Sequence, residues 1–308
     1  PSSIVLNEGL QVIGFGAFYQ TSIKSVHIPA SVTTIGDNAF YGSSSKPIGP
    51  GPISAITFAE GSKLTYIGNM AFAYSVITGI SLPDNVSAMG AQVFYNNYNL
   101  KSIVLPTALK ELSKSTFYNC KGLESVTLPA NLTKIGDTVF SQCNKLKSIN
   151  IPASVTSIGV QAFYSCSSLE SFTLEDNSNL ASVGERFIAY CSSLKSITLP
   201  AVPDLGSISV FTGCTGLEYI DISNPLITEL SDYTGSATNG IPNYHGYFEG
   251  FAKLKEVRLP DTLEIIRSRA FKDCASLESI TIPRGVMSIG DYAFENCSSL
   301  ESILFDKD

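Results

Sequence analysis

The chain has 308 residues and a formal net charge of −7, and it carries no cluster of lysines and arginines. This acidic balance argues against binding to nucleic acid and to an anionic membrane surface. No apolar run approaches the roughly 18 residues of a membrane-spanning helix, so we expect no direct insertion into a membrane.

A unit of 23 residues recurs along the chain, after a shortened first copy that begins at Pro1 with Ile4 and Leu6 in a strand. The unit reads L-x-S-I-x-L-P-x-x-V-x-x-I-G-x-x-A-F-x-x-C-x-x, as in residues 146–168. A fixed period predicts a solenoid of stacked coils, here with thirteen strand segments. The first residue of each full strand segment is Ile23, Ile53, Ile77, Leu100, Leu123, Leu146, Leu169, Leu194, Leu217, Leu254, Leu277 or Leu300.

Each position of the unit has a physical role. Apolar residues alternate in L-x-S-I-x-L, as a strand with one buried face requires, and the proline that follows ends the strand. The V-x-x-I spacing suits a tight return turn, and the next glycine indicates either a positive φ or a close approach of two backbones. The phenylalanine after it predicts a buried stack, formed by Phe18, Phe40, Phe72, Phe94, Phe117, Phe140, Phe163, Phe187, Phe211, Phe248, Phe271 and Phe294.

The recurring strand resembles the leucine-rich repeats, and the complete unit is similar to the BspA-type subclass. The resemblance covers essentially the whole chain. It implies a leucine-rich-repeat solenoid of the α/β horseshoe class, β-dominated, with about 12–13 coils of mostly 23 residues and one parallel β-sheet. It also implies surface display and adhesion, because the subclass is common on surfaces of host-associated anaerobic bacteria and occurs in some parasitic protists. It does not carry over a ligand.

We expect residues 1–308 to form a single leucine-rich repeat domain. The chain begins in mid-repeat without methionine, so we expect it to be trimmed from a longer secreted protein whose signal or anchor segment is absent. We therefore place it outside the cell or at the cell surface. Residues 42–52 are rich in glycine, proline and serine and predict a loop insertion.

Seven cysteines occupy one position of the unit: Cys120, Cys143, Cys166, Cys191, Cys214, Cys274 and Cys297. Neighbouring coils could bring two of them within bridging range. The odd number, and the Ser43, Ser75 or Asn97 found there in other copies, favour a column of buried thiols instead. The spacing does not fit a zinc site, and we expect no metal and no cofactor.

Three columns of the expected outer sheet surface are polar. The first alternates strictly in charge over eight strands: Lys101, Glu124, Lys147, Glu170, Lys195, Glu218, Lys255 and Glu278. Such a ladder indicates a role in register and solubility. The next two columns are mostly serine and threonine. A tyrosine also follows the phenylalanine in several copies (Tyr41, Tyr95, Tyr118, Tyr164); such a row can form a carbohydrate or peptide platform, or pack along the coil edge.

The serine and threonine columns are interrupted once, where the strand from Leu217 carries Tyr219 and Asp221 and the strand from Leu254 carries Glu256 and Arg258. Between them lies the longest insertion, roughly residues 231–247. It contains Tyr233, Tyr244 and His245. Long loops on a rigid scaffold often carry binding residues, so these seven residues are the candidate contact site for a partner. The alternative is an ordinary insertion beside an Asp221–Arg258 ion pair.

The sequence predicts a protein-recognition or adhesion module without catalytic activity, whose partner is a host, matrix or other cell-surface protein. Carbohydrate binding is an alternative, although the chain has no tryptophan, and a passive spacer is another. We expect no enzyme. His27 and His245 lie far apart along the solenoid, and no nucleophile elbow, phosphate loop or metal constellation is visible.

Overall fold

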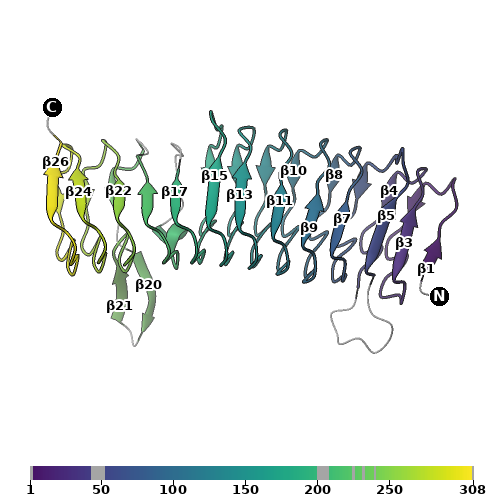
Figure 1. The fold of residues 1–308 in the computed structure, drawn as a ribbon, viewed down its shortest axis with the longest axis horizontal. Coiled ribbons are helices and arrows are strands. Elements are labelled where there is room, and N and C mark those ends of the chain that lie inside the picture. The colour runs from purple at the N-terminus through teal and green to yellow at the C-terminus, as the bar shows by residue number, and fades with distance from the viewer. Residues whose placement is uncertain are drawn as a thin grey trace.

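The computed structural model describes residues 3–42, 53–199, 208–223, 226–230, 233–238 and 241–306, and for 233–238 and 241–245 it describes the backbone. From residue 43 on, the predicted insertion at 42–52 lies outside this part. The chain winds into stacked coils that form an elongated rod with its two ends far apart (Figure 1). No helix among the described residues is both long and apolar enough to cross a bilayer.

The expected strand segments form one wall of the rod, and they number thirteen among the described residues. Each pairs in parallel with at least one neighbouring coil, so that Ser148 lies opposite Ser171 and Ile149 opposite Phe172. The predicted solenoid is therefore confirmed. The ladder is interrupted three times, so the wall consists of four sheets and not of the single sheet that was expected. These long strands are β1 (Ser3–Val5), β3 (Ser25–Ile28), β5 (Ala55–Phe58), β7 (Gly79–Ser81), β9 (Ser102–Val104), β11 (Ser125–Thr127), β13 (Ser148–Ile151), β15 (Ser171–Leu174), β17 (Ser196–Thr198), β18 (Tyr219–Asp221), β22 (Glu256–Arg258), β24 (Ser279–Ile282) and β26 (Ser302–Phe305).

A second, narrow parallel ladder runs along the rod where the sequence indicated only a return turn. The residue before the glycine and the one preceding it pair with their counterparts in the next coil, as Lys134–Ile135 does with Ser157–Ile158. The coil repeat aligns these backbone groups, and pairing satisfies them. The short strands are β2 (Val12–Ile13), β4 (Thr34–Ile35), β6 (Tyr66–Ile67), β8 (Ala88–Met89), β10 (Glu111–Leu112), β12 (Lys134–Ile135), β14 (Ser157–Ile158), β16 (Ser182–Val183), β19 (Glu229–Leu230), β23 (Ile265–Ile266) and β25 (Ser288–Ile289).

The interior of the coils is filled by the expected phenylalanine stack. Consecutive rings from Phe72 to Phe163 lie 5.2–5.6 Å apart in stacked geometry and are fully buried. Each such burial stabilises the fold by roughly 1.5–3 kcal/mol. The only helical turn among the described residues, the 3₁₀ helix η1 (Ile208–Phe211), ends on a member of this column.

One assignment to this stack is wrong, because Phe187 occupies the alanine position and Ile188 occupies the phenylalanine position. The Phe163 N–H donates to the Phe187 carbonyl, as the Phe140 N–H does to Ala162, and the Cys214 thiol donates to the Ile188 carbonyl. In place of a stacked ring, Phe172 of β15 meets Phe163 and Phe187 edge-on, at 5.5 and 5.9 Å. A larger strand residue therefore fills the volume that the isoleucine leaves.

The repeated glycine was expected either to have a positive φ or to allow two backbones to approach closely, and the structure shows the close approach. A Cβ on Gly159 would lie 2.5 Å from the Asp137 nitrogen, and one on Gly136 would lie 2.8 Å from the Leu112 carbonyl oxygen. Positive φ occurs instead two residues later, at residues such as Asn38 (φ 56°). Glycine is thus required because adjacent coils touch there, and not because of its backbone freedom.

The seven cysteines are unbridged, and all except the partly buried Cys297 are buried. The thiol column is therefore confirmed. Each thiol donates to a carbonyl of the preceding coil, as Cys143 does to Phe117 at 3.2 Å. Burial raises the pKa of the Cys120 thiol to about 12, which makes it a poor nucleophile at neutral pH.

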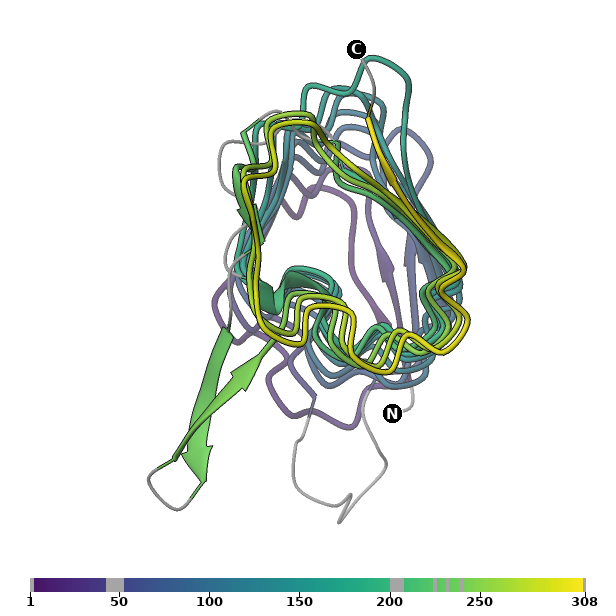
Figure 2. The same cartoon turned by 90° about the vertical axis from the view of Figure 1, so that its left-hand side faces the viewer.

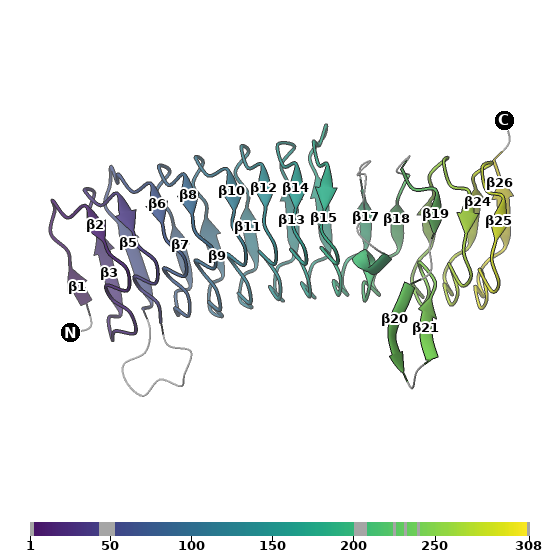
Figure 3. The same cartoon turned by 180° about the vertical axis from the view of Figure 1, so that it is seen from behind.

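An antiparallel hairpin of β20 (Tyr233–Thr238) and β21 (Ile241–His245) follows β19 and leaves the stack of coils (Figures 1 and 3). Its register shifts between Gly235 and Thr238, so that two residues of β20 lie opposite Pro242 alone. Proline lacks an N–H and is tolerated in strands at such bulges.

Candidate functional site

Four of the seven candidate residues come together on the long-strand wall. Strands β18 and β22 are neighbours, with Tyr219 opposite Glu256 and Asp221 opposite Arg258. The long insertion leaves the coil elsewhere, so the two strands pair as though it were absent. We call Tyr219, Asp221, Glu256 and Arg258 the recognition patch.

Asp221 is the buried centre of the recognition patch, with 7% of its surface exposed. Its Oδ1 accepts the Ser223 N–H at 2.9 Å, and its Oδ2 accepts the Tyr219 hydroxyl at 3.4 Å. Arg258 Nη1 lies 3.9 Å from the same Oδ2, while 69% of the Arg258 side chain is exposed. The predicted ion pair therefore exists but is long, and it leaves most of the guanidinium donors facing outward.

The electrostatics of the patch keep Tyr219 protonated. Partial burial is the main cause that raises the pKa of its hydroxyl, and the nearby charges of Asp221 and Glu256 add to it. Tyr219 thus offers a neutral ring and hydroxyl beside an exposed cation. Aromatic and arginine side chains in such proximity are typical of the residues that dominate protein–protein contacts.

The other three candidates, Tyr233, Tyr244 and His245, lie on the hairpin and not beside the recognition patch. Tyr233 pairs with His245, and Thr234 with Tyr244. Viewed along the rod, the hairpin projects from the side of the coil away from the wall that ends in β26 (Figure 2). The chain crosses from the long strand to the short strand before the insertion begins, so the path of each coil separates the two.

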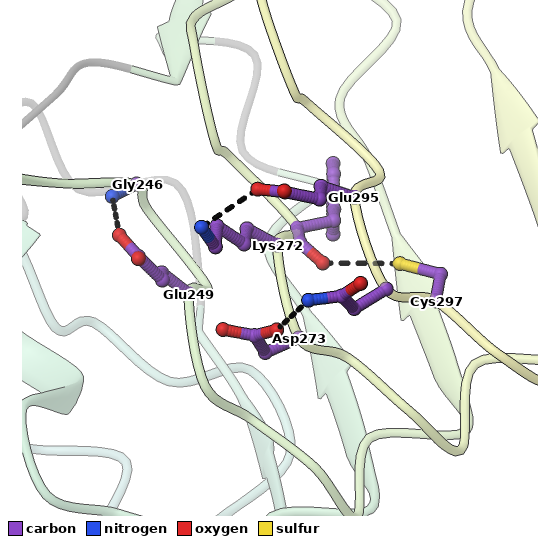
Figure 4. A network of polar contacts seen from close by, with 8 residues as sticks. Gly246, Glu249, Lys272, Asp273, Glu295 and Cys297 are labelled. Atoms are coloured by element: carbon purple, nitrogen blue, oxygen red, sulfur yellow. Dashed lines mark hydrogen bonds and ion pairs between the residues drawn. The ribbon is translucent and has the colours of Figure 1, made fainter.

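The residues after the hairpin are tied to the next coil through the backbone, since the Phe248 N–H donates to the Ala270 carbonyl at 2.6 Å and the Gly250 N–H to the Lys272 carbonyl at 2.8 Å. Within its own turn the Gly246 N–H donates to Glu249 Oε2 at 2.8 Å, and Lys272 Nζ lies 2.6 Å from Glu295 Oε2 of the coil after it (Figure 4). A Cβ on Gly246 would collide with the Arg269 carbonyl. The hairpin therefore emerges from a packed, charged base.

The tyrosine row is longer than the sequence indicated. Its rings join at 4.9–5.7 Å in the order Tyr19, Tyr41, Tyr74, Tyr95 and Tyr118. Pattern matching missed Tyr74 because Ala73 occupies the regular position, yet the ring of Tyr74 still enters the row. Burial, with neighbouring tyrosines, raises the pKa of Tyr41 to about 12.

The geometry of this row leaves little room for a sugar to stack. Tyr41, Tyr74 and Tyr95 each contact a tyrosine ring on both sides, stacked for Tyr19–Tyr41 and Tyr95–Tyr118 and tilted by 52–53° where Tyr74 takes part. Tyr118 also accepts a hydrogen bond from Gln142 Nε2 at 2.8 Å. The row therefore packs along the coil edge, which was the second of the two interpretations.

The remaining polar sites are ordinary. Within the described residues, no group of three or more histidine, cysteine, aspartate or glutamate side chains is placed to hold a metal. His27 is exposed on β3, and its Nδ1 lies 2.9 Å from Thr57 Oγ1. An open groove of about 630 Å³ follows short strands β10 to β16, with Lys134 and Glu111 among its lining residues.

A family model described as the BspA type leucine rich repeat region matches residues 2–49, 51–170, 133–243 and 240–308. The chain belongs to the BspA-type leucine-rich repeat family. This BspA-type protein matches a leucine-rich repeat protein from Bacteroides ovatus with 25% identity and a TM-score of 0.68, over 98% of this chain and 79% of the other.

Two further solved structures match the chain with lower scores. A leucine-rich repeat protein from Eubacterium ventriosum is 23% identical, with a TM-score of 0.49 over 96% of this chain and 82% of the other. A leucine rich cell surface protein from Faecalibacterium prausnitzii is 23% identical, with a TM-score of 0.41 over 100% of this chain and 87% of the other. No curated protein matches the BspA-type chain.

Proposed function

We propose that this BspA-type protein is a non-catalytic recognition module of the bacterial cell surface that binds a host, matrix or other surface protein. Leucine-rich repeat proteins of this type are generally interaction modules and not enzymes. The contact site is the recognition patch on β18 and β22. The hairpin, on another side of the rod, is a separate element.

The observation that carries this proposal is the break in an otherwise uniform surface. Long strands on either side present small serine side chains in the column where β18 and β22 present Tyr219 and Glu256. Arg258 is exposed beside Tyr219, and the buried Asp221 holds the tyrosine hydroxyl. The ring of Tyr219 is held by Asp221 and so loses little side-chain freedom on binding, while the exposed Arg258 offers guanidinium donors to a partner.

The test is a binding screen of the purified chain against extracellular-matrix and host-surface proteins by surface plasmon resonance. We expect a saturable hit that the double variant Tyr219→Ala/Arg258→Ala loses, with unchanged circular dichroism. The matched control is Ser125→Ala/Thr127→Ala on β11, which alters the same two columns away from the patch and should bind normally.

Two results would overturn the proposal. Full binding by the Tyr219/Arg258 variant would remove the patch as the contact site. The absence of any protein ligand at high micromolar concentration would overturn protein recognition itself; a glycan array would then decide between carbohydrate binding and a spacer role.

A further inference from the structure

The alternating charges identified in the sequence form a continuous row on the rod. The row runs across eight consecutive coils, and each member directly precedes one of the long strands from β9 to β24, which lie side by side (Figure 1). Seven of its members are exposed and Glu218 is half-buried. The charged row consists of Lys101, Glu124, Lys147, Glu170, Lys195, Glu218, Lys255 and Glu278.

Pairing within the chain uses little of this charge. Lys255 Nζ lies 2.7 Å from Glu218 Oε2, and the hydrogen bond and charge of that lysine lower the pKa of Glu218. Between residues 101 and 199, all of which the structure describes, no other member of the row forms an ion pair within 4.0 Å. Neighbouring members still attract each other at longer range, as Lys195 attracts Glu218 and Glu278 attracts Lys255, but most of the charges remain available at the surface.

The row has a symmetry property that a single chain does not need. An alternating row with an even number of charges becomes its own complement when it is reversed. A two-fold axis passing between Glu170 and Lys195 would place Lys195 of each copy opposite Glu170 of the other. The same axis would pair Lys147 with Glu218, and it would pair the outer members Glu124 with Lys255 and Lys101 with Glu278.

We propose that the charged row is a self-association surface on which a second copy of this chain docks antiparallel, through an isologous two-fold interface. A C2 interface requires one self-complementary patch, and the charged row provides one over its whole length. The complementarity stops at the two ends of the row. Glu301, which follows Glu278 in the same column, would face Thr78 of the other copy, which is uncharged.

The neighbouring surface allows such an approach. Next to the row, the side chains of β9, β11, β13, β15 and β17 are the exposed serines Ser102, Ser125, Ser148, Ser171 and Ser196. On β18 and β22 the same column carries Tyr219 and Glu256 of the recognition patch, and the axis would place these two opposite the small Ser148 and Ser125 of the other copy. Eight strands at about 4.8 Å spacing extend about 38 Å, so the strip covers roughly 400 Å² per copy. This is below the about 800 Å² per partner of standard stable interfaces, so the dimer is weak and depends on charge.

The experiment is sedimentation equilibrium of the chain alone at micromolar concentrations and above, at low and at high salt. Two charge-neutral double variants are compared with the unmodified chain. E170K/K195E exchanges two residues related by the axis, so every contact between copies stays complementary. K147E/E170K exchanges two residues that are not so related, and it places like charges opposite each other at four of the eight positions.

The two variants are matched in charge. Both keep the net charge and the composition, and both create two pairs of like-charged neighbours within the chain. A structural role within the chain would therefore affect both, and more strongly E170K/K195E, which places a carboxylate beside the Glu218–Lys255 ion pair. Self-association predicts the opposite order. The readout depends on self-association and not on partner binding, so a failure here is distinguishable from a failure of the recognition patch.

We expect a monomer–dimer equilibrium at low salt for the unmodified chain and for E170K/K195E. The dissociation constant should rise about tenfold or more in K147E/E170K, because four weak pairs become repulsive. High salt should dissociate the dimer, since screening shortens the range of these contacts. A chain that stays monomeric at low salt, or an effect of E170K/K195E as large as that of K147E/E170K or larger, would overturn the proposal.

Discussion

The residue that follows the phenylalanine column differs between the two ends of the rod. In the coils before residue 200 it is mainly tyrosine, and the tyrosine rings of neighbouring coils stack along the edge, as Tyr95 does on Tyr118 at 4.9 Å. In the last coils the same position holds Glu249, Lys272 and Glu295, and the last two form an ion pair. The backbone path is the same in both regions.

This comparison shows that the coil backbone does not dictate the force that joins neighbouring coils at the edge. Aromatic stacking removes apolar surface from water and is insensitive to salt, whereas an exposed ion pair is screened by it. The recognition patch and the hairpin both belong to the charged end. The aromatic end also departs from the repeat, at the insertion of residues 42–52 and at Ile188, but its departures do not introduce a cluster of charged side chains.

The largest expected effect tests whether the two regions share one core. Phe117 and Phe271 are both fully buried, with stacked neighbours at 5.4 and 5.1 Å. Replacing either with alanine leaves a cavity and should cost about 3–5 kcal/mol of unfolding free energy. Urea denaturation of the two variants should give similar losses. A loss confined to Phe117→Ala would show that the charged end is held together differently.

The next effect concerns the close approach of the coils. Gly159→Ala and Gly290→Ala, one in each region, would push a Cβ into the backbone of the preceding coil. Each should cost about 1–3 kcal/mol through overpacking. Gly14→Ala is the control, because nothing lies within 4 Å of its added Cβ. Equal thermal stability of Gly14→Ala and Gly159→Ala would contradict the role assigned to the glycine column.

A smaller effect separates stacking from ion pairing directly. Tyr95→Ala removes contacts with Tyr74 and Tyr118 and should cost about 1–2 kcal/mol at any salt concentration. Lys272→Met removes the contact with Glu295 and should have a minor effect that disappears at high salt. Denaturation of both variants at low and high salt makes the distinction. A loss of unfolding free energy in Tyr95→Ala that depends on salt would contradict the distinction between stacking and ion pairing.

The smallest effect is expected in alkali. Burial raises the pKa of Tyr41 from its ordinary 10 to about 12, so the folded chain holds this proton more tightly than the unfolded chain. The resulting stabilisation is complete below pH 10 and is lost as the pH rises towards 12. Burial also raises the pKa of Tyr247 to about 12, so titration followed by tyrosinate absorbance should show more than one late-ionising tyrosine, and Tyr41→Phe should remove one of them. Ionisation of all tyrosines near pH 10 would contradict the packed row.

The periodic sequence predicted the fold well because every coil repeats the same physical requirements. The prediction failed where a residue of the expected type does not occupy the expected position of the repeat. Phe187 was placed in the stack by its residue type, although hydrogen bonding puts Ile188 there, and Phe172 fills the remaining volume from another strand. Tyr74 was missed because it lies one residue after the regular tyrosine position, which Ala73 occupies, although its ring still joins the row.

The candidate site was predicted in part for a similar reason. Residues on adjacent long strands, such as Tyr219 and Glu256, follow the coil register and could be paired from the sequence. The hairpin could not be placed, because a linear pattern shows where an insertion interrupts the repeat but not in which direction it leaves the coil. The expectation that Tyr233 and His245 flank the patch assumed that closeness in sequence meant closeness in space.

The parallel ladders also determine how the rod should respond to tension. The hydrogen bonds of both ladders, such as those between β13 and β15, join one coil to the next. A pull between the two ends would load these coil-to-coil contacts in series, so the terminal coils should peel away one at a time. An extended coil releases its residues as slack before the next one opens. Such a rod would act as a mechanical damper, lengthening stepwise under load while its remaining coils stay folded.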